Sequence, residues 1–566
     1  MVHPVLALTL AALFVRPCAS LDNGLALKPA MGFNTWSSFA LRVNEEDVRQ
    51  TADLLVSLGL KDMGYTYLVL DDGWSEHERT PDGDLVADYS RFPGGMAALA
   101  GHVHARNLSF GMYADSGTST CGGYPGSRGF EARDAAAFAG WGADYLKYDN
   151  CYPKEGDSVR ARYSAMRDAL NATGRPILFS LCEWGVEEPW LWGRAVGNSW
   201  RTTGDSSASW LSLVNNLDNS VGLARYAGPG AWNDPDMLQV SENGEGEWGG
   251  LPRVILLLAW GPKGVKVVIV GGPSVDVPLR GSEVQLPSAG PQQNTASSRA
   301  QDEEALPPLQ TWESGCTYGS VAACPPAIRS CCRAEFALHK QAMQGTWQAM
   351  PTHAPDSPSQ QVGNPGLTLG EQRANLALWS LLKSPLMIST RLQELSNASA
   401  AILLAAEVVA INQDDLGVAG DLIWKQGSKE IYAGPLAGGD RAVVFFNRAE
   451  HDEGAAGARF TLRTEQVGYQ EDTAVRVRDL YARHDIGTFR GRFSARVPPH
   501  DVLVLRLTPE AAPFLKWEGG RRPQDDGWRP WTGQAIYAEH EEDLENITWR
   551  KTEGDDDALE DPAVAI

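Results

Sequence analysis

Short apolar runs alternate with helical patterns between residues 29 and 390, and this alternation constrains the fold more than any other feature of the chain. It is typical of a parallel α/β fold. Eight such units suggest a closed (β/α)8 barrel with helices between the strands, one of which should begin at Asn44 ahead of three acidic residues. The candidate strands span residues 30–36, 65–74, 109–117, 144–151, 177–185, 199–205, 231–240 and 385–390.

Polar and charged side chains gather at the carboxyl ends of these candidate strands, where barrel enzymes build their active sites. Carboxylates that converge on one face repel each other, so packing alone does not explain them. We therefore expect a site formed from Asp71, Asp72, Tyr113, Asp115, Asp149, Glu183, Arg201, Asp205, Asp234 and Asp236.

The stretch 144–151 carries the central candidate. Buried and polar positions alternate along it, so that Lys147 and Asp149 should project from the same face of a strand. A lysine beside a carboxylate favours the ionised carboxylate. A structural salt bridge is the alternative interpretation of this pair.

Composition limits the possible partners. With 566 residues and 43% hydrophobic content, the chain can build a large core and more than one domain. Its net charge of -22 argues against a nucleic-acid or anionic-membrane partner, because both would repel it. The 19 tryptophans fit either a large core or a sugar-binding cleft, since indole faces pack on pyranose rings.

The N-terminus predicts entry into the secretory pathway. Residues 1–20 resemble a signal peptide, with an apolar segment from 5 to 15 and small residues before Leu21. Sequons at Asn107, Asn171, Asn397 and Asn546 are compatible with a glycosylating route. No apolar run is long enough to span a bilayer, so we expect a soluble mature protein, either secreted or lysosomal/vacuolar.

Residues 241–361 differ in composition from the sequence on either side. They are rich in Gly, Pro, Ser and Gln and lack a sustained period. Removing these 121 residues from the span 24–391 leaves 247, the size of an ordinary barrel. The insert could be a lid, a disordered loop or a retained intron in a gene model. The Gln-Val pairs at 239–240 and 361–362 favour the retained intron.

Beyond the barrel, expected to span 21–391, alternating apolar runs predict antiparallel strands. Runs such as 442–446 and 502–505 suggest a C-terminal β-sandwich over 392–508. The acidic remainder, 509–566, should be irregular or a loosely docked tail.

Seven motifs at successive strand ends resemble the melibiase-type α-galactosidases of glycoside hydrolase family 27. The resemblance covers the barrel and the β-sandwich but not the insert or the tail. Its motifs are GFNTW at 32–36, LDDGW at 70–74, YAD at 113–115, YLKYDNC at 145–151, CEWG at 182–185, WRTTGD at 200–205 and WNDPDML at 232–238.

The resemblance implies a retaining double displacement, with Asp149 as nucleophile and Asp205 as acid/base. Such a mechanism needs two carboxyls about 5–5.5 Å apart. Lys147 should keep Asp149 ionised, while Asp205 should hold a proton for the leaving oxygen. In the family, Arg201 helps to hold the sugar and the nucleophile.

The resemblance also implies a galactose-selective pocket. Asp71 and Asp72 should accept hydrogen bonds from the sugar 4- and 6-hydroxyls, and Trp36 should form an apolar wall. A charged Glu183 should favour a free 2-hydroxyl over an acetamido group. The remaining substrate-binding positions are Tyr113, Cys121, Lys147, Cys182, Trp184, Arg201, Asp236 and Met237.

By the same resemblance, Cys121 and Cys151 should form a disulfide and Cys182 should stay free. The chain departs from most relatives at Gly73, where they carry a cysteine, and the usual partner near Leu41 and Arg42 is missing too. No cofactor is expected. A metal site has weak support, because no histidine lies close to the aspartates in sequence.

We therefore expect an α-galactosidase that releases terminal α-linked galactose from oligosaccharides or glycoconjugates, as a monomer or a homodimer. An α-N-acetylgalactosaminidase and a β-L-arabinopyranosidase are the alternatives within the family. A carbohydrate-binding pseudoenzyme whose site is blocked by the insert is the alternative from another class.

Overall fold

The computed structural model describes residues 23–239, 366–451 and 457–510, together with the backbone of three short strands at 255–261, 264–270 and 536–537. The expected signal peptide, the rest of the insert and most of the tail lie outside the described residues. The chain divides into two units, and residues Trp248–Pro358 form the second. In that unit, β8 (Ile255–Gly261) and β9 (Gly264–Val270) pair as an antiparallel hairpin.

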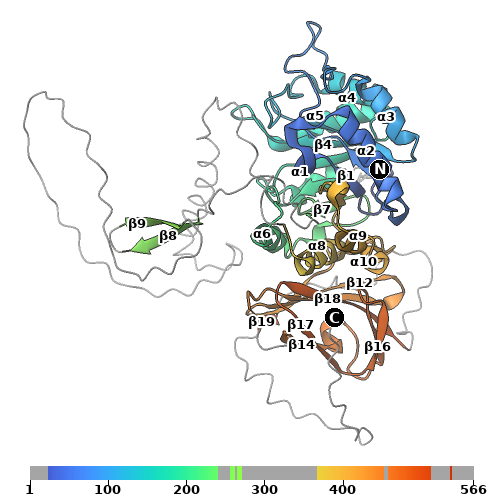
Figure 1. The fold of residues 1–566 in the computed structure, drawn as a ribbon, viewed down its shortest axis with the longest axis vertical. Helices are drawn as coiled ribbons and strands as arrows, with labels where there is room; N and C mark the ends of the chain where they lie inside the picture. The colour runs from blue at the N-terminus through green and yellow to red at the C-terminus, as the bar shows by residue number, and fades with distance from the viewer. Residues whose placement is uncertain are drawn as a thin grey trace, which may run out of the picture. The chain divides into compact units, whose positions relative to one another are not determined.

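The first unit contains an eight-stranded parallel sheet. Figure 1 labels three of its strands, β1, β4 and β7. Each strand falls inside one of the eight predicted spans, and the fold class is confirmed. The strands pair in the order β10-β1-β2-β3-β4-β5-β6-β7, and a bridge between Leu238 and Ile388 joins the two ends of the sheet. They are β1 (Met31–Asn34), β2 (Tyr67–Val69), β3 (Ser109–Asp115), β4 (Tyr145–Asp149), β5 (Leu178–Cys182), β6 (Ser199–Arg201), β7 (Trp232–Asp234) and β10 (Leu386–Ile388).

Helices connect most of these strands. The predicted start at Asn44 is a capping box, in which the Asn44 side chain accepts from the Asp47 N–H and the Asp47 carboxylate accepts from the Asn44 N–H. Two short 3-10 turns, Pro189–Leu191 and Gly193–Ala195, replace an α-helix between β5 and β6. The α-helices are α1 (Trp36–Phe39), α2 (Glu45–Ser57), α3 (Gly95–His104), α4 (Glu131–Trp141), α5 (Val159–Ala172), α6 (Trp210–Ser220), α8 (Leu369–Leu381), α9 (Asn397–Leu403) and α10 (Ala406–Asn412).

The predicted C-terminal sandwich is also present. A seven-stranded sheet has the order β16-β15-β18-β13-β12-β11-β19, and β14 pairs with β17 in a second sheet. All these pairs are antiparallel except β11 with β19. The strands are β11 (Asp421–Gln426), β12 (Lys429–Pro435), β13 (Arg441–Asn447), β14 (Ala458–Arg463), β15 (Val475–Asp479), β16 (His484–Phe489), β17 (Arg492–Val497), β18 (Asp501–Pro509) and β19 (Ile536–Tyr537).

One helix of this unit joins the barrel to the sandwich. Helix α8 packs against β12, β13 and β18, so the barrel and the sandwich share a buried seam. Ten of the helix's thirteen residues are buried, which is the all-round burial expected of a helix enclosed between two layers.

In the part of the chain that the structure describes, none of the helices has the length and apolar character needed to cross a bilayer.

Candidate active site

Strand β4 brings Asp149 to the carboxyl end of the barrel sheet. The register places Asp115 of β3 on one side of Asp149 and Cys182 of β5 on the other. Only 5% of Asp149 is exposed. Because the neighbouring strands end at the same level, the side chains beyond their ends meet around this carboxyl.

Asp149 accepts two hydrogen bonds, from the Tyr113 hydroxyl to Oδ2 at 3.1 Å and from the Asn150 N–H to Oδ1 at 3.0 Å. Burial raises the pKa of Asp149 to about 7; Lys147 opposes this shift, and the Asp205 and Asp71 charges add to it. Asp149 therefore holds a proton more readily than an aspartate in water does.

Lys147 does not pair directly with Asp149 as the sequence suggested. Its Nζ lies 2.8 Å from Oδ2 of Asp71, and both side chains are nearly buried. Asn34 donates a second hydrogen bond, of 2.7 Å, to the same oxygen. Asp71 reaches Lys147 from the end of β2 and accepts the ammonium in place of Asp149. Lys147 acts on Asp149 only as a nearby charge.

Asp205 lies on the loop between β6 and α6, and 52% of its side chain is exposed. Desolvation raises its pKa, but Arg201 and Lys147 outweigh that effect and the net pKa is lowered. Arg201 Nη2 donates to Asp205 Oδ1 at 3.0 Å. We expected an ionised Asp149 and a protonated Asp205. The free site has the reverse preference, because the Arg201 guanidinium contacts Asp205 while Asp149 is desolvated.

Arg201 connects Asp205 to the end of β7 rather than to Asp149. Its Nη1 lies 2.9 Å from Asp236 Oδ1, and the other Asp236 oxygen accepts the Ser206 N–H at 2.6 Å. Asp236 has a φ of 80°, a left-handed conformation that costs a non-glycine residue energy. The Trp379 indole N–H donates to the Asp236 carbonyl at 2.6 Å and helps to hold this conformation.

The adjacent carboxylates at the end of β2 have different surroundings. Asp71 is paired with Lys147, whereas Asp72 accepts the Gly73 and Gly122 N–H groups, each at 2.7 Å. Burial is the main cause that raises the pKa of Asp72 to about 6. The Thr120 side chain also hydrogen-bonds to Asp72 and opposes this shift.

Glu183 differs from the expected charged group. It is fully buried, and burial raises its pKa to about 8, so the carboxyl is mainly protonated at neutral pH. Its Oε1 accepts the Glu187 N–H at 2.6 Å, while Oε2 has no hydrogen-bond partner among the described residues. The next residue, Trp184, is half-buried and has a φ of 62°.

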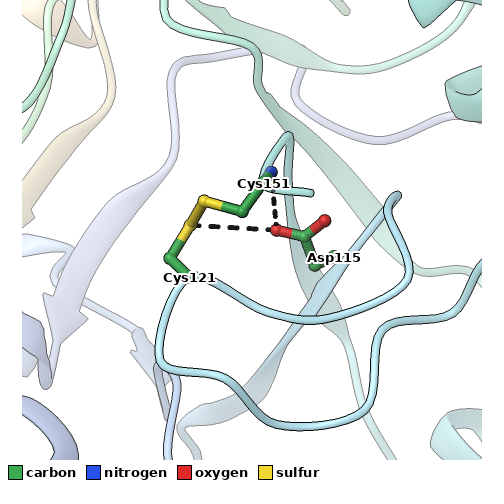
Figure 2. Close-up of side chains that lie close together, drawn as sticks. All are labelled: Asp115, Cys121 and Cys151. Carbon is green, nitrogen blue, oxygen red and sulfur yellow. Dashed lines mark hydrogen bonds between the residues drawn. A yellow bond between two sulfur atoms is a disulfide. The ribbon is translucent and has the colours of Figure 1, made fainter. Parts of the chain in front are cut away.

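A disulfide joins Cys121 and Cys151, the pair that the resemblance implies, and Cys182 is free and buried. Figure 2 shows Asp115 beside this bridge, with its Oδ2 accepting the Cys151 N–H at 2.9 Å. Among the described residues, Asp115, Cys121 and Cys151 form the one group spaced closely enough for a metal. Because the two sulfurs are bonded to each other, this group offers only a carboxylate and does not fit a cation.

Leu41 packs closely against Gly73, the position at which the resemblance predicted a departure from most relatives. Gly73 has a φ of 89°, and a Cβ at this position would lie 3.0 Å from the Leu41 Cα.

A small pocket lies beside these groups, and six of the predicted residues line it: Lys147, Cys182, Arg201, Asp234, Asp236 and Met237. The other predicted residues are not among its described lining residues: Trp36, Asp71, Asp72, Tyr113, Asp115, Cys121, Asp149, Glu183, Trp184 and Asp205. The site prediction missed Asn34, Tyr145, Ser180 and Met387, which complete the lining. Tyr145 and Ser180 lie two residues before Lys147 and Cys182, so the two-residue period of a strand could have identified them.

Comparisons with known proteins agree with this geometry. A family model described as alpha galactosidase A matches residues 29–248 and 323–414, and a model of the alpha galactosidase C-terminal beta sandwich domain matches 426–507. The unmatched stretch between the first two segments, 249–322, lies inside the expected insert and is shorter than it.

Individual proteins give the same result. An α-galactosidase of Coffea arabica is 35% identical over 491 residues, covering 87% of this chain and 96% of the relative. One from Oryza sativa subsp. japonica is 33% identical over 489 residues, covering 86% of each chain. The structure of an α-galactosidase from Saccharomyces cerevisiae with raffinose matches with a TM-score of 0.61 and 27% identity, over 86% of this chain and 99% of that one. On this agreement of sequence, fold and site, the chain belongs to the α-galactosidase A (melibiase) family of glycoside hydrolases.

Proposed function

We propose that the protein is a retaining α-galactosidase that releases terminal, non-reducing α-linked galactose. The observation that carries the proposal is the interaction of a buried strand-end carboxyl, Asp149, with a second, exposed carboxyl, Asp205, beside Lys147 and Arg201. The curated α-galactosidases that the chain resembles over most of its length support the same reaction.

The chemistry has two steps. In the first, an Asp149 oxygen attacks the anomeric carbon while Asp205 gives its proton to the leaving glycosidic oxygen, and an ester to Asp149 forms. In the second, Asp205 removes a proton from water, the water oxygen attacks the same carbon, and the ester bond to Asp149 breaks. Each step inverts the anomeric carbon, so the product keeps the α configuration.

Catalysis needs an ionised Asp149 and a protonated Asp205, the reverse of the free site. We propose that a bound sugar accepts a hydrogen bond from Arg201 and so weakens the interaction of Arg201 with ionised Asp205. The pKa of Asp205 then rises, so that Asp205 rather than Asp149 holds the proton. The two carboxyls then titrate as a pair, and activity is highest where the pair holds one proton.

The carboxylates at the end of β2 supply the proposed selectivity. Asp71 and Asp72 have oxygens that can accept hydroxyls of galactose, and Lys147 can donate to the same part of the sugar. A protonated Glu183 is neutral, so it would act at the 2-position as a hydrogen-bond donor rather than as a charge. Comparing rates on aryl glycosides of α-galactose, α-N-acetylgalactosamine and β-L-arabinopyranose tests this assignment and its two alternatives.

The domain organisation is part of the proposal: a signal peptide at 1–20, a barrel at 21–391 with an insert at 241–361, a sandwich at 392–508 and a tail at 509–566. We propose a secreted or vacuolar glycoprotein, and three of its sequon asparagines, Asn107, Asn171 and Asn397, are exposed. Transcript sequencing across Val240 and Gln361 tests the insert. A message that reads directly from Val240 into Gly363 identifies it as a retained intron.

The test of the function is hydrolysis of para-nitrophenyl α-galactoside by the purified full chain. Asp149→Asn and Asp205→Asn should each be nearly inactive on oligosaccharides. Galactose binding without turnover by the wild-type chain would identify a pseudoenzyme. Full activity of Asp149→Asn would refute the catalytic assignment.

A further inference from the structure

The loop that carries Asp205 leads directly into α6, and the first residue of that helix contacts the sandwich. The Trp210 ring stacks on the His500 ring with centroids 4.1 Å apart and planes 20° apart. It also meets Phe446 of β13 edge-on at 5.4 Å. These contacts join the helix that follows Asp205 to two segments of the other domain.

A second contact lies two turns further along the same helix. Arg448, just after β13, makes a bidentate pair with Asp218, with N–O distances of 2.6 and 2.9 Å. Its Nε lies 2.9 Å from Glu430, which is fully buried and also pairs with Lys425 at 2.6 Å. The sandwich therefore orients the guanidinium before it meets α6.

Hydrogen bonds connect the start of α6 to the residues beside Asp205. The Ser209 hydroxyl caps the helix by accepting the Ser212 N–H at 3.3 Å, and the Ser207 N–H donates to the Ser212 hydroxyl at 2.9 Å. On the other side, the Ser206 N–H is bound by Asp236. A shift of the first turn of α6 would thus move the chain within two residues of Asp205.

We propose that the sandwich residues His500, Phe446 and Arg448 form a clamp on α6 that positions Asp205 for proton transfer. Trp210 and Asp218 are the positioning residues on the barrel side. The inference rests on the proposed role of Asp205 as acid/base. It assigns the C-terminal domain a part in one catalytic function, the proton transfer to the leaving group.

The clamp has a consequence that a purely structural contact lacks. A misplaced acid slows glycosides whose leaving group needs a proton and spares those whose leaving group departs as a stable anion. The ratio of kcat/KM for dinitrophenyl α-galactoside to kcat/KM for methyl α-galactoside therefore reports the position of Asp205. Loss of folded protein changes both values by the same factor and leaves the ratio unchanged.

The experiment compares Trp210→Ala with wild type. We expect kcat/KM for the methyl glycoside to fall about tenfold, a fraction of what a general acid contributes, and that for the dinitrophenyl glycoside to fall less than about twofold. Asp205→Asn provides the reference for complete loss of the acid. An unchanged substrate ratio in folded Trp210→Ala would overturn the clamp.

A matched pair of milder variants guards against misfolding of Trp210→Ala. Asp218→Asn removes the α6 half of the Arg448 contact, and Glu407→Gln removes the α10 half of the bidentate Arg478 contact, with distances of 2.7 and 2.8 Å. Both break an ion pair between a helix and an arginine of the sandwich sheet. We expect only Asp218→Asn to raise the substrate ratio, by about threefold; equal ratios in the two variants would contradict the proposal.

The proposed function and the clamp fail separately in these assays. If wild type hydrolyses neither glycoside, the proposed function is wrong and the clamp falls with it. If wild type hydrolyses both and Asp205→Asn shows the expected leaving-group dependence, but neither clamp variant does, only the clamp is wrong.

Discussion

The two carboxyls of the proposed catalytic pair are supported in different ways. Asp149 ends a strand, is 5% exposed and lies two residues before Cys151, which a disulfide joins to Cys121. Asp205 lies on a loop, its side chain is 52% exposed, and its position depends on Arg201 and on contacts that extend through α6 to another domain.

This difference matches the two roles. A nucleophile must hold one line of attack on the anomeric carbon, which a barrel strand provides. An acid/base must reach the leaving group and later a water molecule, so it needs access to solvent. The predictions below test how far the two regions can be separated.

The largest expected effect separates the two carboxyls by substrate. Asp149→Asn should reduce kcat by roughly a thousandfold or more on every α-galactoside, because no ester can form. Asp205→Asn should reduce kcat/KM by about 10²–10⁴-fold on the methyl glycoside and much less on the dinitrophenyl glycoside. Steady-state rates for the two variants on the two substrates give the comparison. Identical substrate profiles would show that the two carboxyls do not have separate roles.

Removing the disulfide tests the support of Asp149. Replacing Cys121 and Cys151 with serine should lower the free energy of unfolding by about 2–4 kcal/mol, since the bridge closes a loop of 30 residues. The substrate ratio that reports Asp205 should stay at the wild-type value. Denaturant melts measure the first quantity, and reduced wild type is the control. A changed substrate ratio would mean that the two regions are coupled.

Lys147 is the charge that both carboxyls share. It lowers the pKa of Asp149 and that of Asp205, so Lys147→Met should raise both values and move the whole bell-shaped profile of kcat/KM to higher pH, by about one unit. The sign follows because a carboxyl without its cation keeps its proton to higher pH. The control, Lys147→Arg, should keep both limbs near their wild-type positions. A shift of one limb alone would contradict the shared role.

Glu183 provides a stability test on the Asp149 side of the site. Its pKa is about 8 in the folded protein against an ordinary 4.5, so the unfolded chain releases this proton first as pH rises. As pH rises between these two pKa values, Glu183 therefore lowers the free energy of unfolding by about 1.4 kcal/mol per pH unit. Glu183→Gln should remove that slope. Melting temperatures of variant and wild type from pH 5 to 8 should diverge steadily; a constant difference would refute the raised pKa.

Much of the barrel could be predicted from the sequence because its strands are short apolar runs that end in polar residues. Each predicted strand span contains an observed strand, and the observed strands are shorter because some of the polar residues lie beyond the end of the sheet. Asp71, two residues past the end of β2, shows this. The disulfide came from family resemblance, not from spacing.

Contacts between distant segments could not be predicted. The partner of Lys147 is Asp71, 76 residues earlier, and the ring partner of Trp210 is His500 in the other domain. Neither pair leaves a periodic signal, because both depend on how strands and domains are placed. The sequence also did not predict which of Asp149 and Asp205 holds a proton more readily in the free site. Burial and the Arg201 contact set these two pKa values, and both depend on the folded structure.

The most direct test of the catalytic assignment is the stereochemistry of products formed with azide. In Asp205→Gly, azide should attack the ester on Asp149 and give α-galactosyl azide after two inversions. In Asp149→Gly, azide should attack the activated glycoside itself and give β-galactosyl azide after one inversion. Proton NMR of the two products distinguishes these anomers. The same anomer from both variants, or the opposite assignment, would contradict Asp149 as nucleophile and Asp205 as acid/base.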